Sequence, residues 1–115
     1  MATATQIRET AAENLGILGE GETLPSYESD DLDQSYVEVY AELQALGLAT
    51  WPVTSAVPDQ YAKSVAMLVA EGRAVKYQIP DARYQRVKFE AVEALMSIRE
   101  LQARSRMGQT EIENF

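Results

Sequence analysis

The sequence has no cysteine and no histidine among its 115 residues. Without cysteine the chain forms no disulfide and offers no thiolate to a metal ion. Without histidine it lacks the commonest general base and the commonest metal ligand, so nucleophilic triads and dyads of the usual kinds are excluded. These absences favour a protein that is not an enzyme, and we expect no cofactor and no metal.

Long apolar runs and a basic leader are missing as well. No segment has the roughly 20 consecutive apolar residues that a membrane-spanning helix needs. Residues 1–5 lack the positive and apolar regions of a signal peptide, so a soluble cytoplasmic protein is expected. Hydrophobic residues still make up 46% of the chain, which is enough for a single domain with one modest core.

Positive charge is scarce in the first half of the chain. The net charge is −8, and residues 1–59 hold eleven acidic residues against one base, Arg8. Residues 60–115 hold nine bases against seven acids. Uneven charge can simply keep a domain soluble, but it also favours head-to-tail association between copies. The candidate inter-subunit residues are the acids Asp30, Asp31, Asp33 and Glu38 and the bases Arg83, Arg86 and Lys88.

Apolar residues recur at steps of three and four in four segments, which is the period of an amphipathic helix. The sequence therefore predicts an all-α fold, a small four-helix bundle with an extended C-terminal tail. The helices are expected near residues 4–15, 29–47, 58–77 and 81–105. Thr3 or Thr5 is expected to cap the first helix and Ser29 the second, while Pro58 suits the first position of the third.

The last helix carries the longest apolar stripe, which other helices must cover. Its members are Tyr84, Val87, Ala91, Ala94, Leu95, Ile98 and Leu101. Alanines at every fourth position of the third helix allow close packing, so this helix is expected to be the most buried. The residues that we predict in the core are Leu43, Leu68, Val87, Leu95 and Ile98.

Three local patterns suggest binding sites but have simpler explanations. The glycines at positions 16, 19 and 21 follow a helix rather than a strand, so they indicate helix termination and not a phosphate-binding loop. The aspartates at 30, 31 and 33 lack the glycine and the glutamate of a calcium loop, so they are interpreted as helix-start acids. The basic patch at Arg83, Arg86 and Lys88 belongs to an acidic chain that repels DNA, which makes direct DNA binding the weaker interpretation.

Two further features leave alternatives open. Trp51 is the only tryptophan and precedes a proline; it either plugs the end of the bundle or anchors an interface. Gly108 is expected to end the last helix, which divides the chain into a bundle domain at residues 1–106 and a tail at 107–115. The tail either frays or docks on a partner through Arg106, Met107, Ile112 and Phe115.

The order of these parts resembles the head-to-tail adaptor proteins, also called head-completion or connector proteins, of tailed bacteriophages. The matching stretches are residues 7–24, 40–48, Trp51-Pro52, the helix start at 57–61 and residues 90–95, which together cover about residues 5–103. The resemblance rests on the order and spacing of these stretches, since each is ordinary helix punctuation by itself.

The resemblance implies a helical bundle that forms a ring, typically of about twelve copies. Such a ring binds the phage portal protein, extends the DNA channel without sequence-specific contacts and offers a platform to a tail or stopper protein. It implies no catalytic residues, and it places the protein at the head–tail junction of the virion and in the host cytoplasm during assembly. The rival interpretation is a small helical regulatory binding protein that acts as a monomer or dimer.

Overall fold

The computed structural model describes residues 1–19, 22, 24–54 and 56–113, with side chains described as far as Arg104. Four helices occupy this part of the chain: α1 (Ala4–Leu15), α2 (Ser26–Ala45), α3 (Asp59–Glu71) and α4 (Asp81–Glu113). Among the described residues the only β-type pairing is one isolated bridge between Ala2 and Val57. The predicted all-α fold is confirmed.

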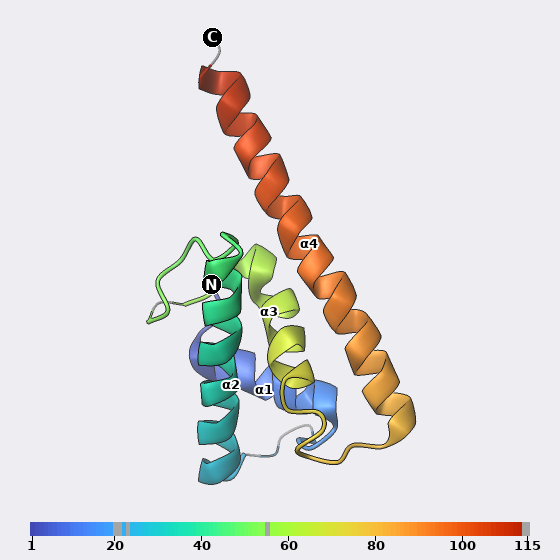
Figure 1. The fold of residues 1–115 in the computed structure, drawn as a ribbon. Helices are drawn as coiled ribbons and strands as arrows, with labels where there is room; N and C mark the ends of the chain where they lie inside the picture. The colour runs from blue at the N-terminus through green and yellow to red at the C-terminus, as the bar shows by residue number, and fades with distance from the viewer. Residues whose placement is uncertain (20–21, 23, 55, 114–115) are drawn as a thin grey trace.

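The helices α2, α3 and α4 run alternately up and down, and α1 crosses behind α2 and α3 (Figure 1). Helix α3 contacts each of the other three helices, and its alanines at positions 66 and 70 are buried, as is Ala74 in the turn that follows it. A side chain on Gly72 would come within 3.0 Å of the Ser35 hydroxyl oxygen. The small residues of α3 therefore allow the close approach that the sequence predicted.

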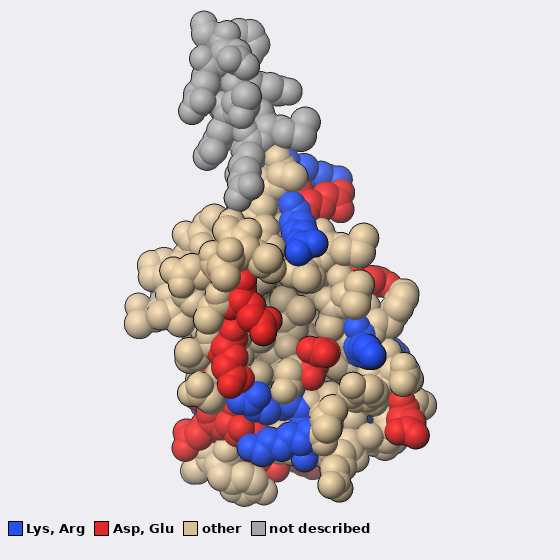
Figure 2. Space-filling view, in the orientation of Figure 1, with Lys and Arg blue, Asp and Glu red and all other residues tan. Residues whose placement is uncertain are grey.

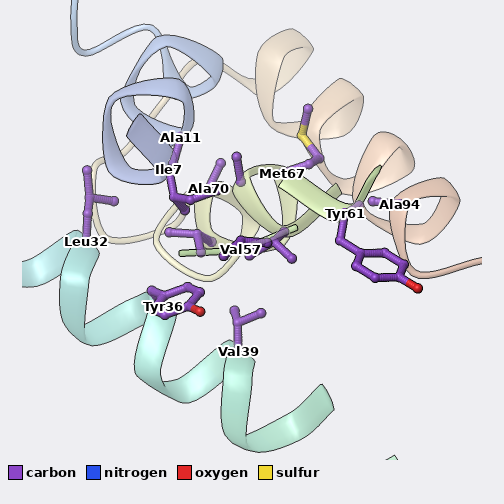
Figure 3. Close-up of a cluster of buried hydrophobic side chains, with 14 of the residues drawn as sticks. Ile7, Ala11, Leu32, Tyr36, Val39, Val57, Tyr61, Met67, Ala70 and Ala94 are labelled. Carbon is purple, nitrogen blue, oxygen red and sulfur yellow. The ribbon is translucent and has the colours of Figure 1, made fainter. Parts of the chain in front are cut away.

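The core lies where α1, α2 and the first half of α4 close around α3 (Figure 3). Of the five predicted core residues, Leu43, Val87 and Ile98 are buried. Leu68 and Leu95 are only partly buried and pack against the rim of the core. The stripe of α4 faces the bundle as predicted, with Ala91 and Ala94 also buried.

Trp51 lies inside the core, with 5% of its surface exposed. Its ring stacks on Tyr61 with 5.4 Å between ring centroids. The Trp51 Nε1 donates a hydrogen bond to the Tyr36 hydroxyl at 3.0 Å, and the Tyr40 hydroxyl donates to the Trp51 carbonyl at 2.6 Å. The interpretation as a plug of the bundle is confirmed, and Trp51 is not an exposed anchor.

The first helix has the predicted boundaries. Thr3 caps α1, and the Gln6 side chain accepts from the Thr3 backbone N–H to complete a capping box. Gly16 ends the helix with φ at 77°, in the left-handed region that favours glycine. Leu18 then folds back onto the core, as expected for an apolar residue inside this turn.

The predicted start of the second helix and the predicted end of the third are wrong. Helix α2 begins at Ser26 rather than at residue 29, because Pro25 precedes it and its carbonyl accepts from the Ser29 N–H inside the first turn. Helix α3 ends at Glu71 rather than at 77. Seven residues of turn follow it, and Gln78 adopts a φ of 50°.

The predicted end of the last helix is also wrong, since α4 continues through Gly108 to Glu113. A glycine inside a helix costs only about 1 kcal/mol relative to alanine, and no proline follows it. A helix of 33 residues is about 50 Å long. The last turns of α4 therefore project beyond the other three helices (Figure 1).

Candidate functional site

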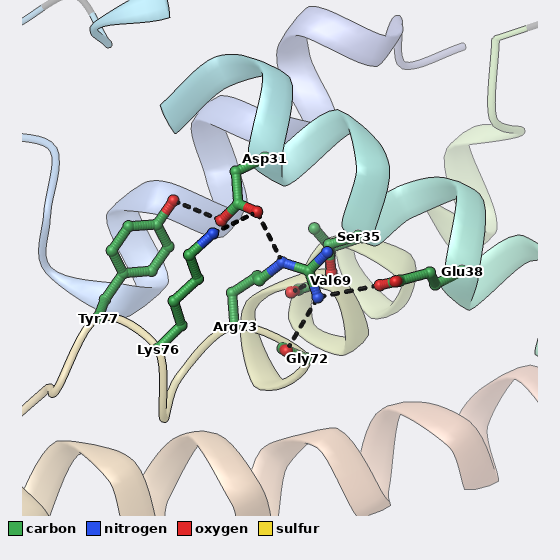
Figure 4. A network of polar contacts seen from close by, with 8 residues as sticks. All are labelled: Asp31, Ser35, Glu38, Val69, Gly72, Arg73, Lys76 and Tyr77. Atoms are coloured by element: carbon green, nitrogen blue, oxygen red, sulfur yellow. Dashed lines mark hydrogen bonds and ion pairs between the residues drawn. The ribbon is translucent and has the colours of Figure 1, made fainter. Parts of the chain in front are cut away.

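The turn after α3 is tied to the start of α2 by a network centred on Asp31 (Figure 4). The Asp31 carboxylate accepts hydrogen bonds from Arg73 Nε at 3.1 Å, Lys76 Nζ at 2.9 Å and the Tyr77 hydroxyl at 2.8 Å. The Arg73 guanidinium also pairs with Glu38 at 2.9 Å. These contacts fix the turn against α2 from inside the same chain.

The surroundings of this network shift the pKa values of Asp31 and Tyr77. Partial burial acts to raise the pKa of Asp31, but hydrogen bonds from Lys76, Tyr77 and Arg73 outweigh burial and hold the pKa below its usual value. Burial raises the pKa of the Tyr77 hydroxyl, and its hydrogen bond to Asp31 raises the pKa further. Asp31 is therefore an ionised acceptor and Tyr77 a neutral donor at neutral pH.

The four acids predicted to face a neighbouring copy have different surroundings. Asp31 and Glu38 belong to the network described above, and Asp33 pairs with Arg8 of α1 at 2.9 Å. Asp30 is exposed and makes no ion pair within the described part of the chain. Most of this predicted acidic face is therefore engaged within its own chain, because these acids of α2 lie against α1 and the loop after α3.

The three predicted bases also differ from one another. The Arg83 guanidinium lies over Gly16, where an added Cβ would come within 2.9 Å of it, and donates to the Asn14 carbonyl at 3.4 Å. It thus places a cation at the C-terminal end of α1, where the helix dipole favours it. Arg86 has a distant pair with Glu90, at 3.9 Å, while Lys88 is exposed and makes no ion pair among the described residues.

The predicted docking tail lies at the edge of what the structure describes. Arg106, Met107 and Ile112 are within the helical backbone of α4, but their side chains are not described. Phe115 lies outside the described residues. Up to Glu113 the segment predicted as an extended tail is thus the end of α4.

Helix α4 has a second apolar face, on the side away from the bundle, that was not predicted from the sequence. Phe89, Val92 and Met96 are 65%, 58% and 63% exposed. They stand at steps of three and four, and the same alternation runs from Gln85 to Ala103 through positions 89, 92, 96 and 99. We call these six residues the outer seam. The signal was present in the sequence, but the longer core stripe of the same helix obscured it.

A shallow acidic groove lies between α2 and α3. Ser35, Val39 and Leu68 contribute to its lining together with the carboxylates Glu38, Glu42 and Glu71. Figure 2 shows acidic residues on both sides of a hollow on this face, with basic residues below them. The groove collects negative charge over an apolar floor, which suits a cationic partner and repels a phosphate backbone.

Among the described residues, no three acidic side chains gather closely enough to hold a metal ion. Within the same residues, no helix is both long enough and apolar enough to cross a membrane. The chain matches no protein-family model, no curated protein and no solved structure.

Proposed function

We propose that this chain is a structural, non-enzymatic adaptor of a bacteriophage virion that forms a ring between the portal and the tail. The ring, of about twelve copies, extends the DNA channel and offers a platform to a tail or stopper protein. The resemblance of residues 5–103 to head-to-tail adaptors motivates the proposal.

The structural observation that carries the proposal is the length of α4. This helix extends past the other three helices, so its C-terminal end is presented away from the bundle (Figure 1). A projecting helix end is suited to docking in a groove of a portal subunit. One such contact is weak, but a ring of them acts together through effective concentration.

The charge of the chain is compatible with this role. A net charge of −8 and the acidic groove repel the phosphate backbone, so DNA can pass through a channel without being held. Most of the predicted inter-subunit acids already form ion pairs within the chain. Of the predicted inter-subunit residues, Asp30, Arg86 and Lys88 are therefore the most accessible to a neighbour.

Electron microscopy of the full-length protein mixed with the portal of its own phage tests the proposal. We expect ring density on the portal with the same rotational symmetry as the portal. The matched variant ends after Arg106 and is expected to lose co-sedimentation with the portal while keeping the fold of the bundle. If this variant still bound the portal at full strength, the segment would have no docking role. If the full-length protein formed no ring on the portal, the proposed function would be wrong.

A second candidate function is a small regulatory binding protein that acts as a dimer. The exposed outer seam of α4 favours it, because such a face is suited to a helical partner. Mass measurement in solution, with and without portal, separates this candidate from the adaptor. A dimer that ignores the portal supports the regulator.

A further inference from the structure

The outer seam follows the spacing of a coiled-coil interface. Its residues Gln85, Phe89, Val92, Met96, Arg99 and Ala103 alternate steps of four and three without interruption, and all six are exposed. In a heptad written a to g, Phe89 and Met96 occupy a and Val92 occupies d, which are the positions that pack between two helices. Three large apolar side chains at these positions are unusual on a surface that faces solvent.

The bundle leaves the seam open to a second helix along its whole length. The residues of α4 that face the core, including Val87, Ala91, Ala94 and Ile98, fall at the c and f positions of the same heptads. Positions c and f lie opposite the a and d positions. Two copies can thus meet seam to seam with their bundles on opposite outer sides.

The charges beside the seam select a second copy in parallel orientation. Lys88 stands at g and Glu93 at e of the next heptad, and in a parallel pair each g residue lies beside the e residue five positions further along the partner. Lys88 of each copy therefore meets Glu93 of the other, twice by symmetry. Both residues are exposed and make no ion pair among the described residues.

An antiparallel pair would place like flanks together, since e then faces e and g faces g. Centred on the apolar part of the seam, that arrangement brings Glu93 of the two copies close together, and like charges so placed repel. The contact between Lys88 and Glu93 is thus possible only in the parallel orientation.

We propose that the free protein forms a parallel two-fold dimer through the outer seam of α4. The seam spans few heptads and has polar residues at two d positions, so the dimer is expected to be weak. This inference goes beyond the ring and does not depend on a portal.

Sedimentation velocity from about 5 to 500 µM tests the dimer. The double variant Val92→Lys/Met96→Lys is expected to stay monomeric throughout. The matched control Val37→Lys/Val75→Lys adds the same charge at exposed apolar residues outside α4 and is expected to dimerise like the unmodified chain. Unchanged thermal melts for both variants exclude misfolding. A monomeric unmodified chain, or equal loss of the dimer in both variants, overturns the proposal.

Charge exchange and cross-linking test the orientation. Lys88→Glu is expected to weaken the dimer about tenfold, and the double variant Lys88→Glu/Glu93→Lys should restore it. Because the chain has no cysteine, Gln85→Cys and Ala103→Cys each provide one thiol, at positions about 27 Å apart on the helix. In a parallel dimer each variant forms a disulfide with itself, whereas cross-linking only in their mixture indicates an antiparallel pair and overturns the assignment.

The outcomes separate this dimer from the adaptor function. A dimer that forms in solution but never binds a portal leaves the inference standing and removes the proposed function. A protein that is monomeric in solution but assembles into a ring on the portal overturns the dimer and leaves the proposed function standing.

Discussion

Asp31 joins the start of α2 to the turn after α3 through three donors, and its side chain is only 15% exposed. A carboxylate that accepts three hydrogen bonds in such a place is costly to neutralise, because the donors then lose a charged acceptor. The adjacent residue Asp30 is exposed and lacks such contacts in the described chain. Asp31 is therefore expected to contribute more to the free energy of unfolding than its neighbour Asp30.

We expect Asp31→Asn to lower the free energy of unfolding by about 1–3 kcal/mol, since an amide replaces a charged acceptor. The matched control Asp30→Asn should change it by less than about 0.5 kcal/mol. Urea unfolding followed by the fluorescence of Trp51 measures both. Equal effects at the two positions would show that the network adds nothing to stability.

The same carboxylate predicts a pH dependence. The pKa of Asp31 is lowered in the folded state, so its contribution to stability is fully present above the unfolded pKa of about 3.9 and is lost as pH falls through the folded value. We expect urea midpoints of the unmodified chain to drop over this acidic range more steeply than those of Asp31→Asn. Parallel curves for the two proteins would contradict this assignment.

At the scale of the element, α4 has three parts with different surroundings. The part of α4 up to Gln102 packs on the bundle through a buried stripe, the opposite side of the helix carries the outer seam, and the last turns extend past the bundle. Gln102 marks the transition, because its buried side-chain amide donates to the Leu48 carbonyl at 3.0 Å and to the Tyr61 hydroxyl at 3.1 Å. It is the last buried side chain described on the helix.

Two residues of the stripe should differ in their cost when truncated. Ile98 is fully buried, so Ile98→Ala should lower stability by about 2–5 kcal/mol. Leu95 is only partly buried, and Leu95→Ala should cost clearly less than Ile98→Ala. Denaturant melts of the two variants give the comparison, and the opposite order would place the stripe in a different rotation about the helix axis.

Removal of the helix end should spare the fold. Residues 107–115 follow the last buried contact described on α4, so a chain that ends after Arg106 is expected to melt within a few degrees of the full chain. Circular dichroism at increasing temperature measures this. A large loss of stability would mean that these residues pack on the bundle rather than serve a partner.

At the scale of the whole molecule, the charge asymmetry of the sequence is partly neutralised inside the fold. Arg8 pairs with Asp33, and Arg73 with Asp31 and Glu38, so bases and acids from distant parts of the chain meet within one copy. The charged surface that remains accessible to a neighbouring copy is therefore smaller than the sequence predicted. An exposed ion pair between two copies would contribute about 0.2–1 kcal/mol and would be screened by salt.

Reversal of the exposed bases should weaken assembly modestly. In Arg86→Glu/Lys88→Glu we expect less ring formation on the portal, with a larger effect at low salt. Arg83 is left in place, because it also holds the end of α1. Ring yield measured across a salt series checks this, and a yield independent of salt in both proteins would remove electrostatics as the cause of assembly.

The sequence alone determined the fold class, the four helices and most of the core, while the place of Trp51 was left between two alternatives. The fold class, the helices and the core follow from local periodicity, because a stripe of apolar residues on a helix is stabilised when other helices bury it. The outer seam could also have been found in the sequence, because its alternating steps are local. Its exposure, however, depends on which of the two faces of α4 the other helices cover.

Only the tertiary structure decided the partners of the charged residues and the reach of α4. The donors to Asp31 come from more than forty positions further along the chain, and no local pattern specifies a contact over such a separation. The helix continues past Gly108 because the cost of one glycine is smaller than what the turns around it contribute together. The low helix propensity of glycine predicts a helix end at Gly108. The actual end depends on the cooperative stability of the whole helix.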